Sequence, residues 1–355
     1  MVGVGGGGGK AVTRMIDHKT NGVDFIAINT DAQDLHLTKA KTKIHIGKNL
    51  TKGLGAGMNP EIGRQAAEEN RDEIHEILKG ADMVFLTCGL GGGTGTGASP
   101  IVAEVARDAG SLVIGVVTKP FSFEGVQRGK IAEDGWHKLK DRVDALITIQ
   151  NDRLLNVITK DTSLLNAFVI CDDVLRQAVQ GIADLIITPG VINVDFADVR
   201  AIMQDAGSAL MGVGYGTGED RAVTAAKSAV GSPLLELSIN GARGVLFNIS
   251  GGSDLTMWEI NEAAKVITES IDREAKVIFG AVEDERLKKG EIKITVIATG
   301  FNPNGINNNN NLRLPLHREE RQEQKKPGPG EKQSQPQLEE SEWDAVPAFL
   351  RRKGK

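Results

Sequence analysis

Aromatic residues are scarce in this chain of 355 residues, since Phe, Trp and Tyr together make up 4% of it. The core must therefore be built from aliphatic side chains. Cysteine is also rare. Cys88 and Cys171 stand in apolar surroundings and in no metal-ligand spacing, which favours buried, reduced thiols over a disulfide framework or a zinc site. The sequence lacks an apolar run of membrane-spanning length and a secretory signal, so we expect a cytoplasmic protein without direct membrane insertion.

Positive charge is not in excess either. The formal net charge is -5 and the pI is about 5.8, which argues against nucleic acid as a main partner. The six histidines are scattered singly, so solvated or packed histidine is the default interpretation for each. Apolar residues nevertheless reach 40%, and a chain of this length has room for two domains of ordinary size.

The first part of the chain alternates short apolar runs with helical stretches, which predicts a parallel sheet covered by helices on both faces. The expected strands are Val23–Asn29, Met83–Thr87, Leu112–Val117, Ala145–Ile149 and Leu185–Thr188. The expected helices are one that begins at Asn59–Pro60 and has an apolar side reaching Leu78, one that begins at Ser99–Pro100 and stops at Gly110, and a long one over Leu165–Ile182.

A second unit of α+β type, with a core of its own, is expected from about Ser208 to Phe301. Its strands are predicted near Ala209–Gly214, Val245–Ser250, Lys276–Gly280 and Ile292–Thr299, and its helices near Asp220–Ala229 and Leu255–Ile271. The glycine cluster Gly212–Gly218 is interpreted as the turn between a strand and the following helix.

The composition changes from Pro303 onward. Five consecutive asparagines are followed by a stretch rich in Glu, Gln, Lys and Pro, which cannot bury enough apolar surface to fold. Large apolar residues return in Trp343–Lys353, together with a basic end. We interpret this segment as a docking peptide on a disordered linker, and the alternative is a chance cluster.

A first glycine run, Gly5–Gly9, follows Gly3 and precedes Lys10 and a helical stretch. Its G-x-G-x-x-G pattern lets backbone N–H groups approach a phosphate at a helix N-terminus, but alone it is a weak signal. A dinucleotide site is an alternative, with Asp24 and Asp31 at the later acidic position. A Walker A motif is excluded, because Val4 occupies the place of its first glycine and Ala11 replaces its Ser or Thr.

A second glycine run, Gly89–Gly97, reads G-L-G-G-G-T-G-T-G after a predicted strand and before a predicted helix. Bare amides there can form an anion-binding nest, and the helix N-terminus adds positive potential. Because a dinucleotide-binding domain has one such loop and this chain has two in one sheet, the pair of loops favours a different nucleotide-binding fold.

The second run resembles the signature loop of the tubulin/FtsZ family of GTPases, in its FtsZ branch. The resemblance extends from Val2 to about Phe301, and the tail peptide is similar separately. It is carried further by the stretches Asn29–Gln33, Gly53–Gly57, Thr118–Phe121 with Glu124–Arg128, Asn151–Arg153 and Phe168–Leu175. It implies a Rossmann-like α/β GTPase domain, a long central helix, a second α+β domain and a disordered tail.

The resemblance also implies a GTP site with Mg²⁺ held mainly by the phosphates. The implied GTP-binding residues are Gly6, Gly7, Gly8, Gly9, Lys10, Gly93, Thr94, Gly95, Glu124, Arg128, Asn151, Phe168 and Asp172. A carboxylate matches the two N–H donors on the guanine edge, and this role falls to Asp172, with Phe168 stacked on the base. Taken alone, Asp172 would be interpreted as a solvated charge on a helix.

The implied catalytic residues are Asn193, Asp195 and Asp198, in a loop that enters the nucleotide pocket of the next subunit. Their carboxylates would orient the attacking water and help to hold a cation. An isolated N-x-D-x-x-D is otherwise a good helix start, with a cap and an acid in the first turn.

The sequence departs from the family pattern in three places. Gly9 and Lys10 stand where two asparagines are usual, Met58 replaces a small residue, and Val169–Cys171 replaces a more polar stretch. The asparagine contacts of the family are therefore not transferred to this chain.

The resemblance implies a GTPase that polymerises head-to-tail into the cytokinetic ring at the bacterial division site, at mid-cell, with hydrolysis completed between subunits and driving filament turnover. We expect a GTP-binding domain (1–165), a central helix and catalytic loop (166–207), a C-terminal domain (208–302), a linker (303–341) and a peptide (342–355) for membrane-tethering division adaptors. The alternatives are a dinucleotide-dependent oxidoreductase and a tubulin-like scaffold that binds GTP without hydrolysis or moves plasmids.

Overall fold

A mixed sheet of ten strands organises the computed structural model, which describes residues 1–18, 20, 22–155, 162–188, 190–192, 194–232, 239, 241–284 and 287–301. The expected linker and docking peptide lie outside these described residues. The strand order is β3-β2-β1-β4-β5-β6-β7-β10-β8-β9. The strands are β1 (Val2–Val4), β2 (Ile26–Asn29), β3 (Thr42–His45), β4 (Met83–Gly89), β5 (Leu112–Lys119), β6 (Ala145–Gln150), β7 (Gly207–Thr217), β8 (Gly244–Gly251), β9 (Lys276–Glu283) and β10 (Glu291–Thr299).

The strands from β3 to β7 pair in parallel, as the alternation of apolar runs and helices predicts. β10 runs antiparallel to both β7 and β8, and β9 is parallel to β8. β7 belongs to both halves. Its first three residues pair with β6, and the remainder pairs with β10 from Leu210 onward. The α+β unit therefore continues the parallel sheet instead of standing beside it.

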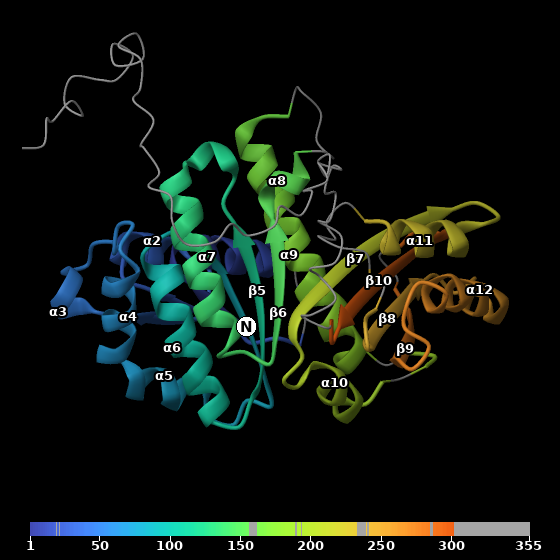
Figure 1. Ribbon diagram of the computed structural model, residues 1–355, viewed down its shortest axis with the longest axis horizontal. Coiled ribbons are helices and arrows are strands. Elements are labelled where there is room, and N and C mark those ends of the chain that lie inside the picture. Colours follow the sequence, from blue (N-terminus) through green and yellow to red (C-terminus); the bar gives the residue numbers. More distant parts are fainter. Residues whose placement is uncertain are drawn as a thin grey trace, which may run out of the picture. The chain divides into compact units, whose positions relative to one another are not determined.

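Helices cover both faces of the sheet (Figure 1). They are α1 (Gly5–Asp17), α2 (Ala32–Leu37), α3 (Lys48–Thr51), α4 (Pro60–Glu69), α5 (Arg71–Leu78), α6 (Thr94–Asp108), α7 (Val126–Lys140), α8 (Asn151–Leu154), α9 (Leu164–Ile187), α10 (Phe196–Met203), α11 (Arg221–Val230) and α12 (Met257–Thr268), with a 3₁₀ turn η1 (Ser122–Glu124). One core contains residues of α1, α9 and α10, a second contains residues of α4, α5 and α6, and a third lies around α11 and α12. Among the described residues, no helix is long and apolar enough to cross a membrane.

Two sequence predictions about helices were wrong. The helix expected from Asn59 is two helices, because Asn70 leaves helical geometry and begins the second one. The expected strand Leu185–Thr188 is instead the last turn of α9 and its C-cap. Three apolar residues followed by a threonine do not distinguish a strand from the end of a buried helix.

The glycine clusters also differ from their interpretation as loops. α1 begins at Gly5 and α6 begins at Thr94, so most of the first run and part of the second are helical, with Pro100 inside α6. Gly212, Gly214 and Gly216 of the third cluster lie within β7, whereas Gly218 follows the strand in the turn that leads to α11. The reason is close packing. A Cβ on Gly97 would lie 1.9 Å from the Pro60 carbonyl oxygen, and one on Gly216 would lie 1.9 Å from the Arg221 carbonyl oxygen.

Candidate nucleotide-binding site

A cavity of about 710 Å³ opens where the parallel strands β1, β2, β4 and β5 end. Val4, Asn29, Gly89 and Thr118, each at or beside the carboxyl end of one of these strands, line it. The volume is in the range of small-molecule sites. Ligands of open α/β sheets bind at this edge, because the loops that follow the strands gather there.

Two helix N-termini meet at one end of the cavity, which we call the phosphate end. α1 starts at Gly5 and α6 at Thr94, and neither has an acidic residue in its first turn. The two starts are adjacent, since a Cβ on Gly5 would lie 2.9 Å from the backbone nitrogen of Gly95. The backbone N–H of Gly93 donates to the carbonyl of Gly57 (2.7 Å), which ties the loop of Gly55–Gly57 to this end. Unpaired N–H groups of two aligned helices make a strong site for an anion.

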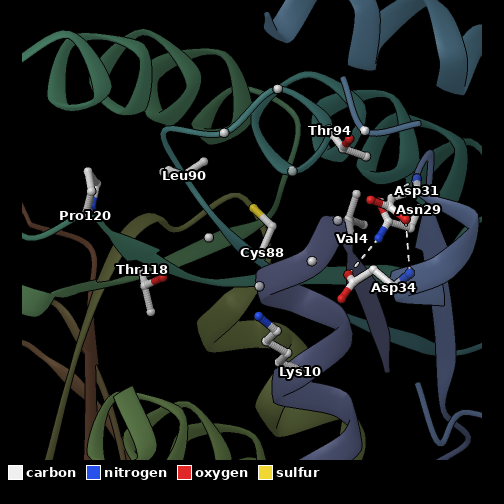
Figure 2. Close-up of a pocket in the computed structure, with 18 of the residues that line it drawn as sticks. Val4, Lys10, Asn29, Asp31, Asp34, Cys88, Leu90, Thr94, Thr118 and Pro120 are labelled. Atoms are coloured by element: carbon white, nitrogen blue, oxygen red, sulfur yellow. Dashed lines mark hydrogen bonds between the residues drawn. The ribbon is translucent and has the colours of Figure 1, made fainter. Parts of the chain in front are cut away.

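Polar side chains from the segment after β2 line one side of the cavity (Figure 2). Asn29 Nδ2 donates to Asp34 Oδ2 (2.9 Å), and Asp31 Oδ1 accepts the backbone N–H groups of Gln33 (2.9 Å) and Asp34 (3.0 Å). Asp31 Oδ2 and Asp34 Oδ1 accept no hydrogen bond from the described residues. These two acids therefore present oxygens beside the phosphate end.

The opposite end, which we call the base end, is built by side chains of α1, α8 and α9. Arg14 Nη1 lies 3.0 Å from Asp172 Oδ2. Phe168 is one helical turn before Asp172, and its ring meets that of Phe121 edge-to-face at 5.5 Å between centroids. Asn151 is 5% exposed, and its Oδ1 has no hydrogen-bond partner among the described residues. A buried, unsatisfied amide oxygen in a cavity wall calls for a ligand donor.

Burial perturbs the titration of three groups in the cavity wall. The pKa of Asp172 is raised from 3.8 to about 6 by desolvation, against the opposing attraction of Arg14 and Lys10. Burial also raises the pKa of the Cys88 and Cys171 thiols to about 12. Both thiols are therefore neutral at physiological pH, as the sequence predicts for structural cysteines.

Glu124 and Arg128 form an ion pair of 2.9 Å across one turn. Glu124 Oε1 also accepts the backbone N–H of Phe121 (2.9 Å). Arg128 lies over Gly91, where a Cβ would be 2.8 Å from Arg128 Cγ. Both side chains of the pair line the cavity between the glycine loop and the base end.

The structure brings most of the expected GTP-binding residues to this cavity. Its lining includes Gly6, Gly7, Lys10, Gly93, Thr94, Gly95, Glu124, Arg128, Asn151, Phe168 and Asp172. Gly8 and Gly9 are buried and are absent from the lining, because Gly8 packs against β1 and β4. Sequence reasoning missed Arg14 and Asp34. Arg14 had one usable signal, its position one helical turn after Lys10 on the same face of α1.

The expected catalytic acids lie apart from the cavity. Asp195 caps α10 by accepting the backbone N–H of Ala197 (2.9 Å), and Asp198 follows in the first turn. Both are exposed and neither lines the cavity. Asn193 lies outside the described residues. Within the described part of the chain, no group of three potential metal ligands gathers anywhere.

Comparison with known proteins identifies the fold. Residues 1–159 match the GTPase domain of the tubulin/FtsZ family, and residues 207–302 match the C-terminal domain of the FtsZ family. The chain is 45% identical to FtsZ of M. jannaschii in a structure described as an empty dimer, covering 84% of this chain and 87% of that chain with a TM-score of 0.80. A mutant of the same protein gives 45% identity, 84% and 90% coverage and a TM-score of 0.81.

CetZ2 from Haloferax volcanii, described as a GTPγS-bound protofilament, is 22% identical over 85% of this chain and 92% of that chain, with a TM-score of 0.72. At this identity the likeness supports the fold alone. The matches to both FtsZ domains and the 45% identity to a relative matched over 87% of its chain exclude the oxidoreductase alternative. They assign the cavity at the strand ends to a GTPase domain, and the chain therefore belongs to the FtsZ family of tubulin-like GTPases.

Proposed function

We propose that the protein polymerises head-to-tail and that each hydrolytic site is completed by two subunits. The observation that carries this proposal is that the expected catalytic acids lie apart from the cavity on the same chain. The cavity holds the phosphate and base ends, whereas Asp195 and Asp198 are exposed elsewhere on the same chain. A second copy of the chain that places the N-terminus of its α10 over the cavity would supply Asp195 and Asp198. Such a contact is heterologous and propagates into an open filament. The dimer of the M. jannaschii relative supports self-association.

Guanine recognition follows from the base end. Guanine offers N–H donors at N1 and N2, and an ionised Asp172 accepts both. Adenine presents an acceptor at N1 and would face the carboxylate with repulsion. The unsatisfied Asn151 Oδ1 gives a further acceptor, and Phe168 gives a stacking surface. The Glu124–Arg128 pair would hold the ribose and phosphates, with Lys10 reaching the same nucleotide.

The donor set fits Mg²⁺ bound mainly through nucleotide phosphates. Mg²⁺ keeps several waters and takes one or two protein carboxylates in such sites, and Asp31 and Asp34 are placed to accept from those waters. The cation supplies neutralisation of phosphate charge. The protein's own contribution is to hold the phosphates on backbone N–H groups and to orient the attacking water through Asp195, Asp198 and Asn193 of the neighbouring copy.

In the cell, we propose assembly in the cytoplasm into a ring at the division site, with Trp343–Lys353 docking on a membrane-tethering adaptor. The sequence of that segment supports this, because apolar anchors and a basic end follow a long polar tract. A plasmid-moving filament is the alternative, and it has no evident use for such a peptide.

Complementation tests the shared site. One variant, Gly92→Glu, puts a carboxylate into the phosphate end without a backbone clash, because a Cβ at Gly92 meets nothing within 4 Å. The corresponding change at Gly95 would confound binding with folding, since its Cβ would lie 2.9 Å from the Gly89 carbonyl oxygen. The other variant, Asp195→Asn with Asp198→Asn, removes both charges and keeps an N-cap residue.

Each variant alone should release almost no phosphate from GTP. In a mixture, the loaded cavity of the second variant meets the intact acids of the first, so phosphate release should return. Gly92→Ala controls for the added side chain and should bind GTP. Sedimentation must show that the two variants co-assemble. Co-assembly without recovered hydrolysis would contradict the shared site.

A further inference from the structure

Three charged side chains meet at the base end, and one of them has no assigned role. Lys10 and Arg14 are one turn apart on α1, and Asp172 faces them from α9. Arg14 Nη1 is 3.0 Å from Asp172 Oδ2, with side chains 27% and 17% exposed. The contact is an ion pair without hydrogen-bond alignment, because Arg14 Nη1 has no hydrogen-bond partner among the described residues although it is buried. This geometry leaves a guanidinium beside the carboxylate that would read the base.

The surroundings of Asp172 favour the neutral acid. Its neighbours in the cavity wall include Phe168, Cys171 and Leu175, and no N–H or O–H of the described residues donates a hydrogen bond to its carboxylate. Desolvation raises the pKa of Asp172 to about 6, and Arg14 is the largest influence in the opposite direction, followed by Lys10. The charge on Asp172 at neutral pH therefore depends on its cationic neighbours.

The other acidic side chains near Asp172 already form ion pairs with other residues. Glu124, before α7, is paired with Arg128 at 2.9 Å. Asp173, on α9, is paired with Arg176 at 2.8 Å and accepts from Gln177. Lys10 is exposed, so solvent screens its attraction. Arg14 is left as the strongest partner of Asp172.

We infer that Arg14 is a positioning residue for nucleotide selectivity, which holds the Asp172 carboxylate as an anion on the cavity wall so that it can accept two donors from guanine. This inference rests on the proposed role of Asp172. A protonated Asp172 would keep one acceptor oxygen and present an O–H in place of the other. Such an acid can no longer accept both N1–H and N2–H of guanine, and one donor would be left unpaired.

If Arg14 acts through the charge of Asp172, its removal should have a pH-dependent effect on selectivity, which a purely structural role of Arg14 would not produce. Without the guanidinium, Asp172 should become protonated at higher pH, so the loss of guanine selectivity should be reversed by raising the pH. Inosine nucleotides are the matched probe, because they lack the N2 amino group and retain N1–H. The ratio of GTP to ITP affinity then reports the state of the carboxylate, and the titration of the phosphates cancels.

Calorimetry of the full-length protein with GTP and ITP from pH 5.5 to 8.5 tests this. For the wild type, the GTP/ITP ratio should be constant at pH 7–8.5 and should fall below about pH 6 by up to tenfold per pH unit. Arg14→Gln should move that midpoint upward by about one pH unit or more and lower the ratio at pH 7, with recovery at pH 8.5. Arg14→Lys, which keeps the charge, should resemble the wild type.

Lys10→Gln is the second variant, on an exposed side chain that does not threaten folding. It should shift the midpoint in the same direction by a smaller amount. An unchanged midpoint in Arg14→Gln would overturn the inference, and so would a loss of selectivity in Arg14→Gln that no pH restores. The variant Asp172→Asn distinguishes a failure of the proposed base site from a failure of the proposed role of Arg14. If it binds GTP and ITP as the wild type does, the proposed base site itself is wrong. If it loses selectivity while Arg14→Gln does not, only the role of Arg14 falls.

Discussion

Two arginine–carboxylate groups lie in different halves of the chain, one around the buried Arg221 and one around the half-buried Arg14 and Asp172, and they are built in opposite ways. Around Arg221, all three guanidinium nitrogens donate. Nε donates to Glu259 Oε1 (2.5 Å), Nη1 to Asp254 Oδ2 (2.7 Å), and Nη2 to the Asp254 carbonyl (2.9 Å) and Glu259 Oε2 (3.1 Å). At the base end, Arg14 offers Asp172 a single contact and keeps a buried nitrogen unsatisfied.

The pKa shifts of the two groups have opposite signs. Hydrogen bonds from Arg221 lower the pKa of Glu259 and of Asp254 below their ordinary values, whereas desolvation raises the pKa of Asp172 to about 6. Thr256 completes the first group by a capping box with Glu259 at the start of α12. The satisfied group joins the start of α11 to the start of α12, while the unsatisfied one is left open for a ligand. The comparison can be tested by removing members of each group.

The largest effect is expected from Arg221→Met. The substitution leaves Glu259 buried without its partner, and breaking a buried pair in this way costs about 3 kcal/mol or more of the free energy of unfolding. Chemical denaturation of the nucleotide-free protein measures it. Arg64→Met is the matched control, because Arg64 pairs with Glu61 on the surface and should cost no more than about 1 kcal/mol. Equal losses in both variants would show that the Arg221 group has no special role.

The next effect is expected on binding. Asp172→Asn removes one acceptor for the guanine edge and faces the base with an N–H₂, so GTP affinity should fall by about 1.5–3 kcal/mol. Asp173→Asn is the control on the adjacent residue, which pairs with Arg176 and does not line the cavity. Calorimetry should find nearly wild-type GTP affinity for the control. A similar fall in both variants would remove Asp172 from the site.

A smaller effect of opposite sign is expected on stability. Because folding raises the pKa of Asp172, its contribution to stability is fully present below its unfolded pKa of 3.8 and is lost as the pH rises through about 6. At pH 7, Asp172→Asn should therefore stabilise the nucleotide-free protein by about 1–2 kcal/mol, less than the full linkage value because Arg14 loses its partner. The gain should vanish near pH 4. For Glu259 the sign is reversed, since its contribution is present above pH 4.5 and is lost on acidification.

The smallest effect is expected from a region outside both groups. Deletion of residues 343–355 should leave GTP turnover and filament formation nearly unchanged, because a long polar tract separates this peptide from the folded unit. Capture of a membrane-tethering adaptor in a pull-down should be lost. A marked fall in GTP turnover of the shortened protein would show that the peptide contributes to assembly.

Part of the order of strands and helices was predictable from the sequence, and so was most of the cavity lining. The sequence analysis did not predict β1, β3, α2, α3, α7 and α8. Alternating apolar runs placed β2, β4, β5 and β6 to within a few residues at each end. Residues of both glycine runs line the cavity, in agreement with their predicted place beside a nucleotide site, but their helical state was not visible in the pattern. Gly8 and Gly97 are required by neighbouring backbone that approaches from elsewhere in the chain. The sequence pattern alone does not show which distant backbone segments pack against these glycines.

Arg14 illustrates a second limit. On α1 alone it is one more basic residue near a helix C-terminus, a favourable position that needs no other explanation. Its relation to Asp172 arises only because α9 passes beside α1, more than a hundred residues later in the chain. Contacts between distant helices decide which charges are buried together, and burial decides their protonation.

The seam between β6 and β7 has a mechanical consequence. Ala145–Ile147 and Gly207–Ala209 are the only paired residues that join the two strands, whereas β7 and β10 pair along Leu210–Thr217. The first core crosses this seam, with Ile147 of β6 and Leu246 and Ile297 of the C-terminal strands among its members, so resistance to a pull across the sheet comes from side-chain packing as well as from strand pairing.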